Sequence, residues 1–247
     1  MKNFESPKSR FVRLIQLGQL VAMLLAVPLA RADGVVIDKV YHPYVDALEK
    51  EMEWRSIFQD PQKDIETRAQ KHQLSLGRSI GEKLFGEVYV VGGKSRSGSF
   101  HVDAYEAELK WQLTEQGEYA ADWGLLFEYE NETNADIHEA TLGVLTEKEW
   151  GSWSGTANLL LINEWGDDID AEFETVLALQ ARYRYSMLLE PTVEFYAGQD
   201  TLAAGPVVQG TFATGVRKNV HWEAGLLFGL DAHSANQTWR FQLEYEF

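Results

Sequence analysis

Residues 239–247 read WRFQLEYEF and alternate strictly between bulky apolar and polar side chains. Because successive side chains of a β-strand point to opposite faces, this pattern predicts a strand with one apolar and one charged face. The sequence stops on that strand. In lipid, an open strand edge would leave backbone N–H and C=O groups without partners. We therefore expect the last strand to pair with the first and close the sheet.

The same period of two recurs along the chain in segments of roughly ten residues, which is typical of transmembrane β-barrels. Residues 105–113 (YEAELKWQL) and 173–185 (FETVLALQARYRY) place apolar side chains on one face and mostly polar ones on the other. A soluble β-sandwich also alternates, but its strands usually have about five or six residues. We therefore predict an all-β fold, a closed antiparallel transmembrane β-barrel of about 12 strands. The expected strands are 47–58, 72–80, 83–92, 100–113, 120–131, 137–147, 152–163, 173–185, 189–199, 207–216, 220–231 and 238–247.

The expected connections alternate in length. Those after odd-numbered strands tend to be long and polar, and those after even-numbered strands are mostly short. In bacterial barrels the long loops face outward and the short turns face the periplasm, so both termini are expected to be periplasmic. One short turn, 217–219, is expected to have three residues, with Asn219 in the left-handed conformation.

The charge balance excludes one class of partner. Lys and Arg number 22 against 38 Asp and Glu, which gives a formal net charge of -16. Nucleic-acid binding depends on neutralising phosphates with Lys and Arg, so no nucleic-acid partner is expected. The chain has no cysteine, which excludes disulfides and thiolate metal sites.

The N-terminus has the parts of a secretory signal peptide. Basic residues come first, an apolar run with LVAMLLAV at its centre follows, and Ala30-Arg31-Ala32 fits a small-x-small cleavage pattern. A transmembrane anchor is the alternative, but the uninterrupted apolar run is too short for one. We expect residues 1–32 to be a signal peptide, 33–46 to be an N-terminal periplasmic or plug segment, and 47–247 to be the transmembrane barrel.

Tryptophans are expected at the membrane interfaces. Aromatic girdles at both edges of the apolar band are typical of membrane barrels. Four tryptophans fall near the expected periplasmic strand ends on the apolar face: Trp111, Trp123, Trp153 and Trp222. Core aromatics of a soluble sheet are the alternative interpretation.

The chain resembles the outer-membrane β-barrel proteins of Gram-negative bacteria. The mark of that class is a C-terminal Phe that closes a strand of alternating hydrophobic residues, here Phe241, Leu243, Tyr245 and Phe247. The resemblance implies that the barrel-assembly machinery reads the last strand. It also implies a location in the outer membrane, in contact with lipid and lipopolysaccharide.

The polar faces should line an acidic lumen. By strand parity the inward acids include Glu106, Glu108, Glu128, Glu130, Glu194 and Glu223, and the inward bases include Arg182, Arg184 and Arg240. Rings of Asp and Glu favour cations, so a narrow acidic pore predicts cation selectivity. The alternative is that these groups pair across the lumen and close it. The turn between strands eight and nine predicts that Arg182 lies directly opposite Glu194.

The sequence offers little catalytic chemistry. A hydrolase needs a Ser or Thr beside a base, and His101 near Ser97 and Ser99 is the best candidate pair. It fits no known catalytic motif, and a polar outer loop is the favoured interpretation. We expect no enzymatic activity and no cofactor.

One loop carries a weak metal candidate. Asp167, Asp168 and Asp170 lie in GDDIDAE, and oxygen ligands in such density suit Ca²⁺. The loop lacks the spacing of an EF-hand, so a solvated acidic loop is favoured and no metal is expected.

Three functions remain open. The first is a small channel or selective porin for cations or small polar solutes. The second is a structural or interaction barrel, closed to solutes, that acts through its loops or its N-terminal segment. The third is an outer-membrane lipid hydrolase.

Overall fold

A computed structural model describes residues 37–60, 70–94, 98–199 and 201–247. The expected signal peptide and its cleavage site lie outside these residues and stay predictions. Among the described residues, no helix has the length and hydrophobicity needed to cross a membrane.

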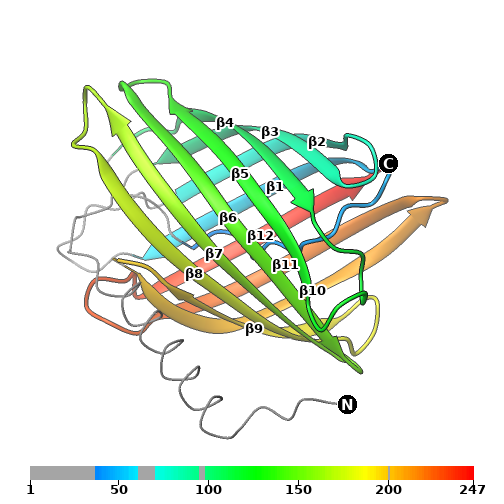
Figure 1. The fold of residues 1–247 in the computed structure, drawn as a ribbon. Coiled ribbons are helices and arrows are strands. Elements are labelled where there is room, and N and C mark those ends of the chain that lie inside the picture. The colour runs from blue at the N-terminus through cyan, green and yellow to red at the C-terminus, as the bar shows by residue number, and fades with distance from the viewer. Residues whose placement is uncertain (1–36, 61–69, 95–97, 200) are drawn as a thin grey trace, which may run out of the picture. The chain divides into compact units, whose positions relative to one another are not determined.

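Twelve antiparallel strands make up the described part of the chain (Figure 1). They are β1 Lys50–Asp60, β2 Gln70–Ser79, β3 Leu84–Lys94, β4 His101–Gln112, β5 Asp122–Glu132, β6 Ile137–Trp150, β7 Trp153–Gly166, β8 Glu172–Tyr183, β9 Glu190–Ala197, β10 Leu202–Gly215, β11 Lys218–Gly229 and β12 Gln237–Glu246. Each strand pairs with its neighbours in sequence, and β12 pairs with β1 to close the barrel. The predicted fold class is confirmed.

Closure involves the whole length of the last strand. The β1–β12 register runs from Glu51 opposite Glu246 to Asp60 opposite Gln237. The backbone N–H of Phe247 also donates to the carbonyl of Lys50 at 2.8 Å. Both ends of the strand array therefore lie at one end of the barrel, which we call the terminal end. The opposite end is the far end. Which compartment each end faces stays a prediction.

The polarity of the wall is inverted relative to a soluble protein. On β1, Glu53 and Arg55 are buried inside the barrel, whereas Met52 and Trp54 are exposed on its outer surface. Charged residues are almost never fully buried unless they are paired. An apolar outer band around a polar interior is the arrangement that a lipid bilayer requires.

Two local predictions were wrong. The turn between β10 and β11 has two residues, 216–217, and Arg217 rather than Asn219 has the positive φ of 55°. A bulge between Ala213 and Gly215 supplies the extra residue that keeps the apolar faces aligned. Strand β10 also starts at Leu202 instead of 207. Its ladder with β11 skips Gly205 and Pro206 without a change of register, since proline has no N–H to donate.

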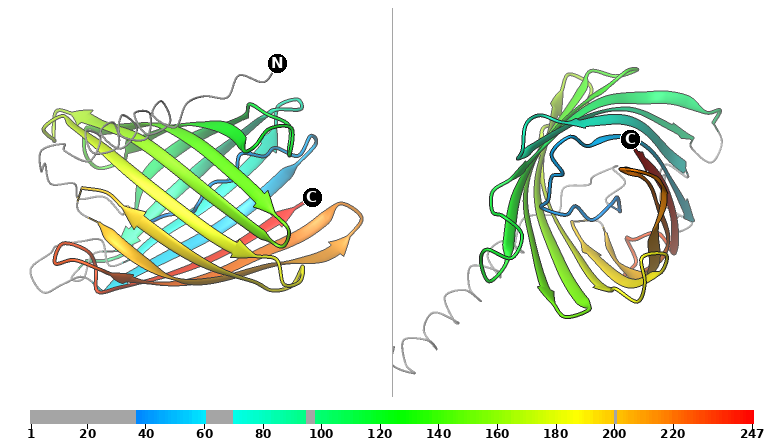
Figure 2. Two further views of the ribbon diagram at one scale, coloured as in Figure 1. Left: turned by 60° about the horizontal axis from the view of Figure 1, so that its bottom comes forward. Right: turned by 90° about the vertical axis from the view of Figure 1, so that its right-hand side faces the viewer.

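Residues 37–46 lie inside the barrel, and we call them the luminal segment. In the right-hand view of Figure 2 this part of the chain, in blue, runs within the ring of strands. The segment forms hydrogen bonds or ion pairs with residues of β1 to β7, β9 and β12. Ile37 and Val40 belong to a buried apolar cluster that includes Ala178, Ala203 and Leu227 of the three remaining strands.

Candidate functional site

Tyr41 fixes the luminal segment at the centre of the lumen. Its backbone N–H donates to the side-chain oxygen of Asn158 at 2.7 Å, and the Asn158 amide donates to the Tyr41 carbonyl at 2.9 Å. The Asn158 side chain thus provides both backbone partners that a neighbouring strand would provide. The Tyr41 hydroxyl lies 2.7 Å from Glu128 and 3.0 Å from Glu108.

The residues before Tyr41 are held by ionic contacts. Lys39 Nζ lies 3.1 Å from Glu53, 3.7 Å from Glu87 and 2.9 Å from the Tyr89 hydroxyl. Burial would lower the pKa of Lys39, but these carboxylates outweigh it and raise that pKa well above its usual value. The Lys39 ammonium is therefore a fixed positive charge near the middle of the lumen.

Asp38, next to Lys39, is a negative residue of the segment that contacts a positive residue of the wall. Its carboxylate forms an ion pair with Arg55, whose Nε lies 2.9 Å away, and its carbonyl accepts from Arg240 and from the Tyr196 hydroxyl. Burial acts to raise the pKa of Asp38, but Arg55 and the nearby lysines outweigh it and lower that pKa.

The rest of the segment follows the wall toward the terminal end. His42 Nδ1 lies 2.5 Å from Glu147, and the Tyr44 hydroxyl donates to Asp122 at 2.9 Å. The backbone N–H of Val45 donates to Gln112 at 2.8 Å. Each contact uses an inward polar side chain of the wall, so the wall and the segment match along the whole path.

The predicted pair of Arg182 and Glu194 does not form. The two residues share the inner face, but Arg182 lies opposite Thr192 and Glu194 lies opposite Gln180, two residues from the expected register. The short connection 184–189 holds an isolated bridge between Ser186 and Leu189, a detail that strand parity does not reveal.

Glu194 is paired with Arg240 instead. Both side chains are fully buried, and Arg240 Nη2 lies 2.7 Å from Glu194 and 2.5 Å from Glu223. Arg182 forms ion pairs with Glu147 at 3.4 Å and with Glu190 at 3.5 Å. Three inward bases predicted from the sequence, Arg182, Arg184 and Arg240, therefore face the lumen but are engaged by carboxylates.

Glutamates form a continuous row near the far end. Each lies directly opposite the next on five neighbouring strands, β4 to β8. We call the set the glutamate row: Glu106, Glu130, Glu139, Glu164 and Glu172. The predicted patch of Glu106, Glu108, Glu128 and Glu130 is part of this wall, because Glu108 lies opposite Glu128 on the next inward level. Sequence reasoning missed Glu139, Glu164 and Glu172, although strand parity also gives Glu139 and Glu164.

Two cavities lie on either side of the segment. The far-end cavity has a volume of about 410 Å³ and includes four members of the glutamate row in its lining. The terminal-end cavity has a volume of about 400 Å³. Lys39 and Tyr41 line both cavities, so the luminal segment is the partition between them.

The two linings carry different charge. In the far-end cavity the described residues supply eight carboxylates (seven Glu and Asp38) against two lysines, Lys39 and Lys71. In the terminal-end cavity, Lys110, Arg182 and Arg184 join Lys39 as cations among the carboxylates, together with His42 and His221. The terminal-end lining also has eight carboxylates, so the acidic excess is larger near the far end because the far-end lining has fewer cations.

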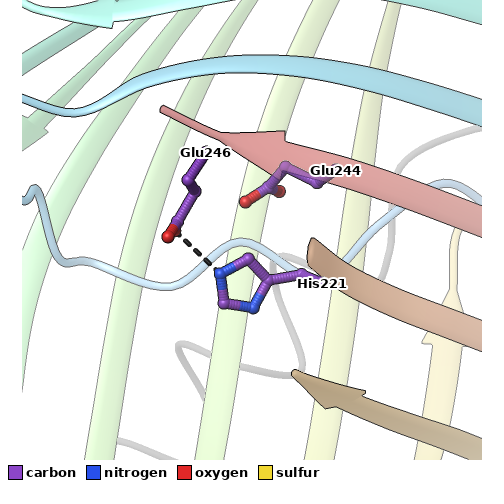
Figure 3. Close-up of side chains that lie close together, drawn as sticks. All are labelled: His221, Glu244 and Glu246. Carbon is purple, nitrogen blue, oxygen red and sulfur yellow. Dashed lines mark ion pairs between the residues drawn. The ribbon is translucent and has the colours of Figure 1, made fainter. Parts of the chain in front are cut away.

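His221, Glu244 and Glu246 could hold a metal ion at the terminal end. Their ligand atoms lie within 4.8 Å of one another. Figure 3 shows the three side chains together, with the ion pair of His221 and Glu246 at 2.8 Å marked. The sequence candidate Asp167, Asp168 and Asp170 forms no such group among the described residues, and Asp168 accepts the backbone N–H of Asp136 at 2.7 Å instead.

The aromatic and terminal residues lie on the outer surface. Trp111, Trp123 and Trp153 are exposed near the terminal end, and Trp222 is half-buried and packs on Phe212 with ring centroids 6.4 Å apart. The C-terminal residues are similarly placed: Phe241, Leu243 and Phe247 are exposed, and Tyr245 stacks on Phe247. Their roles as girdle and assembly signal stay predictions.

The hydrolase candidate gains no catalytic contact. His101 Nδ1 lies 3.1 Å from the backbone carbonyl of Ser99, and Nε2 lies 2.7 Å from Asp103. The hydroxyl of Ser99 takes no part in these contacts, and Ser97 lies outside the described residues.

Comparisons with known proteins show the fold. No family model and no curated protein matches the sequence. Among solved structures, the KdgM porin in complex with disordered oligogalacturonate has a TM-score of 0.55 at 12% identity, covering 80% of this chain and 99% of that chain. The COG4313 outer membrane channel from Pseudomonas putida F1 has a TM-score of 0.56 at 13% identity, with coverage of 85% and 98%.

A third structure has the same fold and another role. The β domain of the Bordetella autotransporter BrkA has a TM-score of 0.55 at 12% identity, with coverage of 81% and 99%. At such identities the likeness shows the architecture alone. The predicted resemblance is confirmed at that level: the chain has the fold of the outer-membrane β-barrel proteins.

Proposed function

We propose that this barrel is a narrow outer-membrane channel for small cationic or polar solutes, with the luminal segment as its constriction. The observation that carries the proposal is the glutamate row, which places a carboxylate on each of five neighbouring strands around the lumen. Rings of Asp and Glu raise the local concentration of cations and repel anions.

The similar structures support a channel more than an enzyme. Two of them are the KdgM porin and the COG4313 outer membrane channel. The KdgM structure contains oligogalacturonate, whose sugar units carry carboxylates. Eight carboxylates against two lysines in the far-end cavity disfavour an acidic ligand of that kind here. The solute class of this chain should therefore be of opposite charge.

Cation selectivity is the direct test. The refolded mature chain is placed in a planar bilayer under a KCl gradient, and the reversal potential is measured. We expect a potential of the sign that cation permeation gives. The triple variant Glu130→Gln, Glu139→Gln and Glu164→Gln should move the permeability ratio several-fold toward unity.

A matched control separates local from total charge. Glu82, Glu115 and Glu118 are exposed in the turns 80–83 and 113–121 at the terminal end. Changing these three to Gln alters the net charge equally but should leave the reversal potential near the wild-type value. Anion selectivity of the wild type would overturn the proposal.

The closed interaction barrel is the second candidate. One observation favours it: the luminal segment is attached to strands all around the barrel and separates the two cavities. Deleting residues 37–46 distinguishes the two functions. A channel with this constriction conducts before the deletion and conducts more after it. A barrel that conducts only after the deletion would be closed in its native state.

A further inference from the structure

The far-end cavity has an apolar layer directly beneath its acidic mouth. Leu160 of β7 lies opposite Val176 of β8 and, on its other side, opposite Gly143 of β6. Ile162, one inward position closer to the far end, also lines the cavity. Leu160 and Ile162 are half-buried, so part of each side chain remains open to the cavity.

This layer continues to the floor of the cavity. Leu160 packs against the buried cluster of Tyr41, Leu126 and Leu145. On β7, Leu160 and Glu164 of the glutamate row are four positions apart, which corresponds to about 13 Å along the strand. Glu128 and Glu174, at the level between them, also line the cavity. Ile162 lies at this same level, directly opposite Glu174, so the apolar surface begins beside the carboxylates and continues to Leu160 below.

The acidic level has more carboxylates than counter-charges. Within the described residues, no Lys or Arg lies within ion-pair distance of Glu106, Glu128 or Glu130, and Lys39 and Lys71 are the two cations of the cavity lining. Like charges directly opposite each other on neighbouring strands are destabilising, so a bound cation would offset this repulsion. The apolar level would be stabilised by an apolar ligand, because removing the exposed parts of Leu160 and Ile162 from water lowers the free energy.

We propose that the far-end cavity binds an organic cation with an apolar body. The ammonium or guanidinium group lies among Glu106, Glu128 and Glu130, and the apolar body lies on Leu160 and Ile162. The cavity volume of about 410 Å³ is within the range of about 300–1,000 Å³ for small-molecule sites. As the solute class of the channel this inference rests on the proposed function, whereas the binding site itself does not.

The acidic groups alone would accept any cation, so the selectivity of the proposed site for an organic cation depends on the apolar layer. A metal ion or tetramethylammonium would contact only the carboxylates. An apolar ring attached to the ammonium would also cover Leu160 and Ile162. The preference between such probes therefore measures the contribution of the apolar layer directly.

The experiment compares three probes on the folded mature chain in detergent by isothermal titration calorimetry. They are benzyltrimethylammonium, tetramethylammonium, which lacks the ring, and benzyl alcohol, which lacks the charge. We expect benzyltrimethylammonium to bind at least about tenfold more tightly than either of the others, since covering one ring supplies more than the free energy of a tenfold change.

Two sets of variants assign the preference to the two levels. Leu160→Asn with Ile162→Asn should abolish the preference for the ring but keep tetramethylammonium binding, and Ile162→Leu should preserve the preference. Glu128→Gln with Glu130→Gln should weaken both cations. Glu118→Gln is the control, because it makes the same kind of substitution in an exposed turn at the terminal end, away from the cavity. Heat modifiability on gels checks that each variant is folded.

Each outcome bears on one proposal. Equal affinity for benzyltrimethylammonium and tetramethylammonium, or no binding of either by folded wild type, overturns the amphiphilic site. Cation-selective conductance together with such a result would leave the proposed function intact. Ring-dependent binding in a barrel that does not conduct would support the site and reject the channel.

Discussion

The two cavities have nearly equal volumes but are built on different principles. Near the terminal end, Glu147 is completely buried and contacts His42, Arg182 and Arg184, although Glu51 still lies opposite Glu246 there. The glutamate row near the far end has carboxylates opposite carboxylates. Charges that are paired hold a wall together, whereas charges that repel each other can be satisfied by a ligand. The difference indicates that the wall around Glu147 is structural, whereas the glutamate row is available for binding.

Removing an acid from the paired wall should have the largest effect. Glu147→Gln leaves the positive groups that surround it without their shared carboxylate, and breaking a buried ion pair from one side typically costs about 3 kcal/mol or more. Urea unfolding followed by tryptophan fluorescence measures the change in the free energy of unfolding. A loss similar to that of Glu118→Gln would show that the terminal-end wall does not depend on its charge pairs.

Removing an acid from the glutamate row should have a smaller effect of opposite sign. Glu130 lies directly opposite Glu106 on one side and Glu139 on the other. Like-charged pairs of this kind cost about 0.2–1 kcal/mol each, so Glu130→Gln should stabilise the folded barrel by about that amount in the same assay. Destabilisation by Glu130→Gln would mean that the row is held by partners as firmly as the other wall, and the contrast between the cavities would be lost.

The pH dependence tests the partition between the cavities, and it should be the smallest effect. The pKa of Asp38 is lowered from the ordinary value of 3.8 because Arg55 and nearby lysines outweigh the effect of burial. A carboxyl whose folded pKa is depressed contributes stability above its unfolded pKa, and this contribution is lost as the pH falls through the folded pKa.

Asp38→Asn should therefore flatten the fall of stability in acid. We expect wild type and variant to differ less at about pH 3 than at about pH 5 in the same unfolding assay. Asp46→Asn, at the exposed end of the segment, is the matched control and should retain the wild-type slope. An unchanged slope in Asp38→Asn would show that the ion pair with Arg55 does not anchor the segment.

The fold could be predicted from the sequence because strand alternation is a local property. Each segment shows in its own sequence which residues lie on its two faces, so the strands can be counted. The last strand needs a hydrogen-bonded partner in lipid, so closure of the sheet follows. The turn at 216–217 could not be predicted in detail because the bulge before it shifts the count by one residue. The register of β9 against β8 was predicted two residues away from the observed one, because strand parity does not reveal the isolated bridge between Ser186 and Leu189 in the connection.

The site was less accessible because its contacts are not periodic. Nothing in the local pattern shows that the backbone of Tyr41 meets Asn158, which lies 117 residues away. One signal was present for the apolar layer. The unbroken run Leu159 to Ile162 interrupts the alternation, which means that β7 must have apolar side chains on both faces at that level.

The luminal segment also has a consequence for the order of assembly. Its contacts with β12 join residues 202 apart in sequence, as between Asp38 and Arg240. Contacts of such long range form late, because the chain between them must be ordered first. The segment can therefore reach its full set of partners only after the final strand is in place. Interactions that form after the folding transition state slow unfolding rather than speed folding. In this barrel, residues 37–46 would therefore influence how long the finished protein persists more than how fast it folds.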